Sequence, residues 1–266
     1  MSSRRLKYLI KSKSLSFVKD LKDKSHHISS IIWNDNKVFY RTSSSDMILI
    51  YEILLQSKYK SEYFFPDILN PKVIFDIGGN IGITSIYLAS IFPDAKIYTF
   101  EPLPDNFEIL KKNIQKYKNV EAFNIRLGSK NGTFKVYLTN DSENFGGFSF
   151  YTDTDTYSSD TFISCEVENV NEVIEKLQIK SIDLIKIDTE GSEYDILMAI
   201  KEDFLRQTKW ITGELNGNKD FELLNYLNQL GFSVGLKKQI DNRFFMFHAG
   251  KLEIISQLSG GDLKAL

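Results

Sequence analysis

The sequence predicts an α/β fold with a doubly wound, mostly parallel β-sheet, and three observations support this prediction. From Val73 onward, short runs of β-branched and aromatic residues alternate with segments of helical periodicity, as expected when helices cover both faces of a parallel sheet. The first run leads into a glycine-rich turn, Gly78 to Gly82, that opens a helix. The last two runs are close enough in sequence to pair as an antiparallel hairpin at one sheet edge.

The predicted elements alternate along most of the chain. Strands of the main sheet are expected at residues 72–76, 96–100, 120–125, 182–187, 209–213, 232–236 and 243–248. Helices are expected at residues 81–91, 104–117, 170–177, 192–200 and 220–230. Two further strands, 132–138 and 162–167, are expected to flank a polar loop at 139–160.

Residues 1–66 are expected to form an N-terminal cap that packs on a domain comprising residues 67–266. The turn sequence Asn34-Asp35-Asn36 separates two β-like runs and predicts a hairpin. Asp46 precedes the apolar run 47–55 and is expected to cap a helix there. The first 24 residues carry eight Lys and Arg side chains, which predicts a basic helix that is either solvated or in contact with an anionic substrate, membrane surface or partner.

Composition excludes several classes of protein. A net charge of −2 gives no sign of nucleic-acid binding. No apolar run approaches the roughly 18 residues of a membrane span, so stable membrane insertion is not expected. The single cysteine, Cys165, cannot form an internal disulfide and is consistent with a cytoplasmic location.

The stretch from Asp76 to Gly82 predicts a ligand site at the end of the first strand. Its glycines, Gly78, Gly79 and Gly82, let the backbone approach a ligand closely. Their spacing does not match the G-x-G-x-x-G fingerprint of dinucleotide-binding proteins, and an acid beside a pyrophosphate would be unfavourable. A cationic sulfonium ligand with an amino-acid group suits Asp76 better.

Glu101 follows the next strand at the same sheet edge, where a carboxylate can accept hydrogen bonds from both hydroxyls of a ribose. Combined with the glycine-rich turn and the antiparallel C-terminal hairpin, this acid predicts a class I, Rossmann-like methyltransferase that binds S-adenosylmethionine.

A second group of acids is predicted at the carboxyl ends of two later strands. Asp188, Glu190 and Glu193 follow one strand and Glu214 follows the next. Asp188 and Glu190 are expected to be functional, whereas Glu193 is equally compatible with a first-turn helix acid. Asp188 and Glu214 could act as a general base with its orienting partner, or could hold Mg²⁺.

With these residues in place, the chain resembles the FkbM family of methyltransferases over roughly residues 45–215. The matching segments are Phe75-Asp76-Ile77-Gly78-Gly79-Asn80-Ile81-Gly82, Phe100-Glu101-Pro102, Leu127-Gly128, and Ile185-Lys186-Ile187-Asp188-Thr189-Glu190-Gly191-Ser192-Glu193. The last resembles the family's I-K-I-D-x-E-G-x-E signature. Two departures are Arg126, where a small residue is usual and the adenine pocket would be altered, and the segment from Cys165, where the family more often has a Thr-Leu-Asp step.

The resemblance implies methyl transfer from S-adenosylmethionine to a hydroxyl oxygen. The cofactor-binding residues that we predict are Asp76, Gly78, Gly79, Asn80, Gly82, Glu101 and Pro102. The residues expected to face the acceptor and act in catalysis are Asp188, Glu190 and Glu214.

We expect the acceptor to be a sugar, a nucleotide-activated sugar or a glycan precursor, for example of a surface polysaccharide. The alternatives are a methyltransferase of another small molecule or of nucleic acid, an NAD-dependent oxidoreductase, and a binding module that has lost catalysis. The segment Asn144-Phe145-Gly146-Gly147-Phe148 is a candidate lid. The apolar run 47–55 offers a surface for a homodimer.

Overall fold

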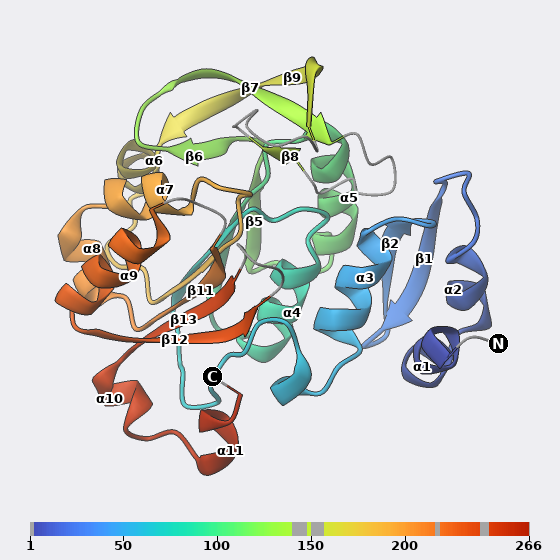
Figure 1. Ribbon diagram of the computed structural model, residues 1–266, viewed down its shortest axis with the longest axis horizontal. Helices are drawn as coiled ribbons and strands as arrows, with labels where there is room; N and C mark the ends of the chain where they lie inside the picture. The colour runs from blue at the N-terminus through green and yellow to red at the C-terminus, as the bar shows by residue number, and fades with distance from the viewer. Residues whose placement is uncertain (1–2, 140–147, 150–156, 216–218, 240–244, 266) are drawn as a thin grey trace.

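The computed structural model describes residues 3–139, 148–149, 157–215, 219–239 and 245–265. Its centre is a seven-stranded sheet (Figure 1). The strands are β3 (Val73–Ile77), β4 (Lys96–Phe100), β5 (Val120–Phe123), β10 (Leu184–Ile187), β11 (Trp210–Leu215), β12 (Phe232–Gln239) and β13 (Phe245–Lys251).

The strand order confirms the predicted class I methyltransferase fold. Across the sheet the order is β12-β13-β11-β10-β3-β4-β5. The five strands from β5 to β11 run parallel, whereas β13 pairs antiparallel with both β11 and β12. The order reverses direction between β3 and β10, and ligands of open α/β sheets bind beside such a switch point.

Helices cover both faces of the sheet, and alternate residues of each strand divide the core in two. Ile74 packs on the side of α4 and the N-terminal cap, whereas Phe75 packs on the side of α7 and α9, as expected for strands buried on both faces. The helices after the cap are α4 (Ile83–Ile91), α5 (Pro104–Ile114), α6 (Val170–Lys176), α7 (Glu193–Ala199), α8 (Glu202–Gln207), α9 (Asp220–Gln229), α10 (Leu252–Ile255) and α11 (Gly260–Leu263).

A row of buried polar side chains crosses the cap-facing side of this sheet. In-register neighbours on adjacent parallel strands project from the same face, and Thr99, Asp76, Lys186, Thr212 and His248 are successive register partners from β4 to β13. All five are buried. We call them the polar row.

A second, four-stranded sheet lies beyond one end of the main sheet (Figure 1). Its strands are β6 (Arg126–Gly128), β7 (Gly132–Thr139), β8 (Phe148–Ser149) and β9 (Tyr157–Asn169). Strand β9 begins five residues before the expected position 162, so the predicted loop 139–160 is wrong at its C-terminal end. Most of the candidate lid, residues 144–147, lies outside the described residues.

The cap consists of two helices, a hairpin and an irregular helical segment. The hairpin is confirmed, with β1 (Ile28–Trp33) antiparallel to β2 (Asn36–Arg41). The helix expected at 47–55 is instead a short α-helix, α3 (Asp46–Leu49), that continues as a π-helix, Ile50–Leu54. The remaining cap elements are α1 (Ser3–Ser12), α2 (Leu15–Asp20) and a 3₁₀ turn, Lys58–Lys60.

Asp46 is not the helix cap that the sequence predicts. Ser45 occupies the N-cap position, and the Asp46 carboxylate accepts from the Arg41 backbone N–H and from two guanidinium nitrogens of Arg41 at 2.8 to 3.0 Å. Arg41 also donates to Asn106 Oδ1 on α5 at 2.7 Å. The carboxylate therefore ties the hairpin to α3, and the guanidinium ties both to the domain beneath.

The cap has no separate hydrophobic core. Its buried residues Phe17, Met47 and Ile50 belong to the same cluster as Ile74 and Trp210 of the main sheet. Met47, Ile50, Ile53 and Leu54 of the 47–55 segment are thus buried within the chain, whereas Ile48 is 38% exposed, and the homodimer stays a prediction. In the part of the chain that the structure describes, no helix is long and apolar enough to cross a membrane.

Removing the charge of Asp46 is expected to destabilise the fold strongly. Asp46→Asn leaves the buried Arg41 guanidinium without its counterion, and breaking such a pair costs about 3 kcal/mol or more. Glu121→Gln is the matched control, because the Glu121–Lys96 pair is half exposed and such pairs contribute below about 1 kcal/mol. Urea unfolding of both variants measures the difference; equal, small losses would contradict the assigned role.

Candidate active site

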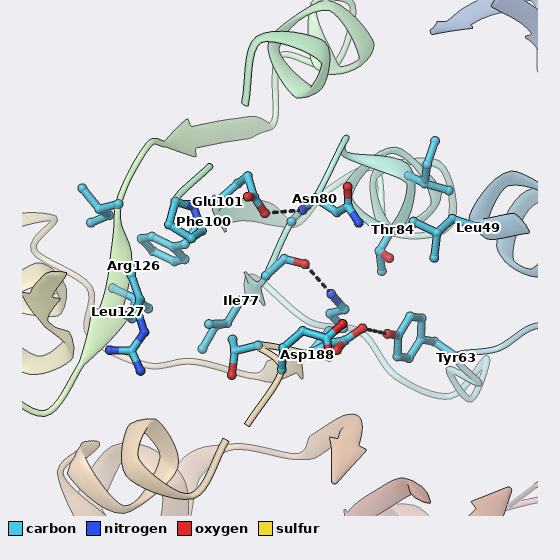
Figure 2. A pocket seen from close by; sticks show the side chains of 18 residues that line it. Leu49, Tyr63, Ile77, Asn80, Thr84, Phe100, Glu101, Arg126, Leu127 and Asp188 are labelled. Carbon is cyan, nitrogen blue, oxygen red and sulfur yellow. Dashed lines mark hydrogen bonds between the residues drawn. The ribbon is translucent and has the colours of Figure 1, made fainter. Parts of the chain in front are cut away.

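A cavity opens to solvent at the carboxyl ends of β3, β4 and β10. Figure 2 shows Arg126 and Leu127 at one end of it, and Leu49, Thr84 and Tyr63 at the other. The walls therefore come from the main sheet, from β6 and from the cap. This is the place where open α/β sheets bind ligands.

The glycine-rich turn forms the floor of the cavity. The backbone N–H groups of Gly78 and Gly79 donate to the Phe100 carbonyl at 3.0 and 2.9 Å, which folds the turn toward the end of β4. Gly78 has a φ of +81°, and a Cβ atom there would overlap the Asp188 carbonyl oxygen. The site therefore requires glycine at this position, and the backbone is left open to a ligand.

Of the seven predicted cofactor residues, five line the cavity: Gly78, Gly79, Asn80, Glu101 and Pro102. Asp76 and Gly82 are not in the lining. Gly82, with φ +85°, stands at the N-cap of α4. Asp76 is fully buried behind the turn, where it accepts from Ser85 Oγ at 2.5 Å and lies 3.4 Å from Lys186 Nζ. The direct cofactor contact that we predicted for Asp76 has no support in this geometry.

Glu101 is positioned by three donors around its carboxylate. Oε2 accepts from the Asn80 backbone N–H at 2.8 Å, and Oε1 accepts from the Leu103 N–H at 2.9 Å and from Asn106 Nδ2 at 3.4 Å. Burial raises the pKa of Glu101 to about 7, although these donors act in the opposite direction. Because a carboxylate offers about four lone-pair sites, Glu101 keeps acceptor capacity for a ligand.

Lys186 is a buried cation at the centre of the site. Its Nζ donates to the Gly78 carbonyl at 2.6 Å and lies over the Tyr63 ring, 5.4 Å from the centroid. Burial lowers the pKa of Lys186, but the carboxylates of Asp76 and Asp188 outweigh burial, and its pKa lies above the usual value. Lys186 therefore stays charged and holds the carbonyl of the turn in place.

Asp188 lines the cavity directly after β10 and accepts a hydrogen bond from the Tyr63 hydroxyl at 2.8 Å (Figure 2). Tyr63 comes from the cap and is only 2% exposed. Burial and the nearby Asp188 charge raise the pKa of Tyr63 well above its usual value. The tyrosine therefore remains a hydrogen-bond donor that fixes one carboxylate oxygen of Asp188.

Glu190 and Glu214 both lie near the negative charge of Asp188. Glu190 lines the cavity with a left-handed φ of +56°, an uncommon conformation outside glycine. Burial, with Asp188 and Glu214 nearby, raises the pKa of Glu190 well above the usual range. Burial and Asp188 likewise raise the pKa of Glu214 to about 9, although Glu214 is outside the cavity lining. Both carboxyls are thus favoured in their protonated form at neutral pH.

Glu193 stabilises the turn that follows β10. Its carboxylate accepts from the backbone N–H and hydroxyl of Thr189 and from the Gly191 N–H at 2.7 to 3.0 Å. It therefore orders the turn that carries Glu190.

The described residues give no support for the Mg²⁺ alternative. Among the described residues, no group of three or more His, Cys, Asp or Glu side chains is placed to hold a metal ion. One oxygen of Asp188 already accepts from Tyr63.

Four residues that were not predicted from the sequence also line the cavity: Leu49, Tyr63, Thr84 and Lys186. Lys186 had a detectable signal, since a charged residue in the middle of an apolar strand must find a buried partner. Tyr63 and Leu49 had none, because they reach the cavity only through the packing of the cap.

Comparison with known proteins places this geometry in a family. Residues 76–234 match the family model described as the methyltransferase FkbM domain. AMB antimetabolite synthetase AmbE of Pseudomonas aeruginosa is 27% identical over 205 residues, covering 62% of this chain and 10% of AmbE. Methyltransferase 1 of Beauveria bassiana is 24% identical, covering 65% of this chain and 76% of that protein. The 2-O-methyltransferase NoeI of Sinorhizobium fredii is 25% identical, covering 56% and 65%.

The chain thus spans about a tenth of AmbE and about two thirds of NoeI. The family match covers more than half of the chain, from Asp76 through the cavity residues to β12. The expected resemblance is confirmed: this chain belongs to the FkbM methyltransferase family.

Proposed function

We propose that the protein is an S-adenosylmethionine-dependent O-methyltransferase whose acceptor is a hydroxyl of a sugar, a nucleotide-activated sugar or a glycan precursor. The observation that carries this proposal is the Asp188 carboxylate, which lines the cavity beside the glycine-rich turn with one oxygen fixed by Tyr63. A hydroxyl needs a base to become a nucleophile, and a fixed carboxylate is suited to that role. The name of NoeI, a 2-O-methyltransferase, agrees with oxygen as the atom methylated.

The cavity residues fit S-adenosylmethionine. Glu101 offers acceptors for ribose hydroxyls, and Phe100 and Leu127 offer an apolar surface for adenine. The buried Oδ1 of Asn80 lines the cavity without a hydrogen-bond partner in the described part of the protein, and it can accept from the ammonium of the methionine part. When bound, S-adenosylmethionine supplies a methyl group on a positively charged sulfur.

In this proposal Asp188 accepts the proton that the acceptor hydroxyl loses as its oxygen is methylated. Tyr63 holds Oδ2 of Asp188, which leaves Oδ1 to accept from the acceptor hydroxyl. The protonated carboxyl of Glu190, which lines the cavity, acts as a hydrogen-bond donor to a polyol rather than as a further base. Alignment of the hydroxyl by these groups contributes the remainder of the rate.

The alternatives are weaker on the same observations. A nucleic-acid acceptor would bring phosphate charges next to the Asp188 carboxylate, which is unfavourable. The family match argues against an NAD-dependent oxidoreductase. A small molecule other than a sugar is the second candidate, favoured by the name of AmbE as an antimetabolite synthetase.

The cytoplasm remains our proposal for the compartment, based on one buried, free cysteine.

The charge of Glu101 predicts a pH dependence of stability. With a folded pKa of about 7, raised from 4.5, the folded protein retains this proton where the unfolded chain has lost it. The contribution of Glu101 to the free energy of unfolding is therefore fully present below pH 4.5. It falls by about 3 kcal/mol as the pH rises through about 7. Glu101→Gln should remove this loss, so that its stability relative to wild type improves by that amount between pH 5 and 8. Exposed Glu108→Gln is the control, and a pH-independent difference for Glu101→Gln would contradict the shifted pKa.

Calorimetric titration tests cofactor binding. S-adenosylmethionine should bind the wild type with micromolar affinity, whereas NAD should not. Glu101→Ala removes two hydrogen bonds to a charged acceptor, each worth about 1.5 kcal/mol, and should weaken binding by roughly a hundredfold. Tight NAD binding, or an unchanged affinity in Glu101→Ala, would overturn the assignment of the ribose site.

Turnover with sugar acceptors tests the base. Asp188→Asn should keep S-adenosylmethionine binding but lower kcat by about 10² to 10⁴. Tyr63→Phe should lower kcat by about tenfold without changing S-adenosylmethionine affinity, because the hydrogen bond that fixes Asp188 is lost. Tyr59→Phe, a half-exposed cap tyrosine, should leave kcat unchanged. A wild-type rate in Asp188→Asn would exclude Asp188 as the base.

A further inference from the structure

The positive charge of the chain is concentrated at its N-terminus. The first 24 residues hold eight of the 33 Lys and Arg residues but only two of the 35 Asp and Glu residues. This segment therefore has a formal charge of +6 in a chain of −2, which leaves −8 on the remainder. Such asymmetry indicates an interaction with an anionic partner rather than a requirement of the fold.

Helices α1 and α2 carry this segment as a pair at one end of the molecule (Figure 1). Their inner side is well packed: Tyr8, Phe17 and Val18 are buried, and Tyr8 stacks on Tyr51 with ring centroids 4.2 Å apart. The pair is therefore a fixed part of the cap, and its outer side has a defined composition.

That outer side combines aliphatic and basic side chains. Leu6, Ile10 and Leu15 are 49%, 63% and 67% exposed, and Leu6 and Ile10 stand one turn apart on the same side of α1. Around them, the exposed basic side chains are Lys7, Lys11, Lys13 and Lys19. Single exposed aliphatic residues are ordinary, but aliphatic residues set among lysines on one helix pair are typical of helices that lie in a membrane interface.

The same composition argues against nucleic acid as the partner. The two aromatic side chains of residues 3–24, Tyr8 and Phe17, are both buried, so neither can stack on a base. Apart from the partly exposed Arg5, the described cations around the aliphatic residues are exposed lysines, which act as point charges, whereas recognition of nucleic-acid phosphates favours the bidentate guanidinium of arginine.

We propose that the outer side of α1 and α2 is a peripheral membrane-binding surface for bilayers that contain anionic phospholipid. Leu6, Ile10 and Leu15 enter the boundary between headgroups and acyl chains, and the surrounding lysines contact lipid phosphates. Because Tyr51 belongs to the same irregular helical segment that follows Leu49, this surface is joined directly to a cavity wall. The proposal does not depend on which acceptor the enzyme uses.

Co-sedimentation of the full chain with lipid vesicles tests the proposal. Vesicles of phosphatidylcholine with one third phosphatidylglycerol should bind the wild type, and phosphatidylcholine alone should not. Each lysine contributes roughly fivefold in affinity, so a triple Lys7→Gln, Lys11→Gln, Lys13→Gln variant should bind roughly a hundredfold more weakly. A triple Leu6→Ser, Ile10→Ser, Leu15→Ser variant should lose roughly tenfold or more.

The control removes the same charge from the opposite end of the molecule, around α6 and α8 (Figure 1), by changing Lys176, Lys180 and Lys201 to Gln. This variant should bind as the wild type does. Circular dichroism and S-adenosylmethionine titration check that all variants are folded. No binding to anionic vesicles, full binding by the serine variant, or an equal loss in the control would overturn the proposal. Stronger binding to single-stranded RNA, lost with the same N-terminal lysines, would assign the surface to nucleic acid instead.

Discussion

The buried ammonium of Lys186 is the interaction on which the site depends. It stands in β10 between the register partners Asp76 on β3 and Thr212 on β11, within the polar row. Two carboxylates, Asp76 and Asp188, lie close enough to raise its pKa. Without this cation the fully buried Asp76 carboxylate would lie in the protein interior without its counterion, which is strongly disfavoured. Lys186 thus provides a counterion for Asp76 behind the glycine-rich turn and lies close to Asp188 in the cavity.

The same cation controls the shape of the turn. Lys186 donates to the Gly78 carbonyl, while the N–H groups of Gly78 and Gly79 donate to the Phe100 carbonyl and the Asn80 N–H donates to Glu101. Together these hydrogen bonds fix the backbone of the glycine-rich turn that lines the cavity. Such preorganisation on strand ends is what a transfer reaction requires, because it acts mainly through alignment.

The sequence predicts the elements whose signals are local, and it fails where a residue's partner is distant. The strands and glycine-rich turn were found because buried runs and glycine spacing are visible within ten residues. Asp46 was misplaced as a helix cap because its true partner, Arg41, is recognisable only once the hairpin has packed on α3. Asp76 was assigned to the cofactor because it ends a strand, yet the pleat turns its side chain toward Lys186 and Ser85. Tyr63 lies in an irregular segment with no periodicity, so only the tertiary structure brings it to Asp188.

The cap therefore belongs to the active site as much as to the fold. From Arg41, a chain of hydrogen bonds runs through Asn106 to Glu101, and Asn113 on α5 binds both the Phe39 backbone and the Ile81 carbonyl. Cap residues also supply one end of the cavity wall, through Leu49 and Tyr63. Under the proposed function, the cofactor rests on the turn and strand ends of the main sheet, and the acceptor is partly enclosed by the cap. Changes within the cap would then alter acceptor choice while cofactor binding is preserved, provided that the Arg41 and Asn113 contacts remain.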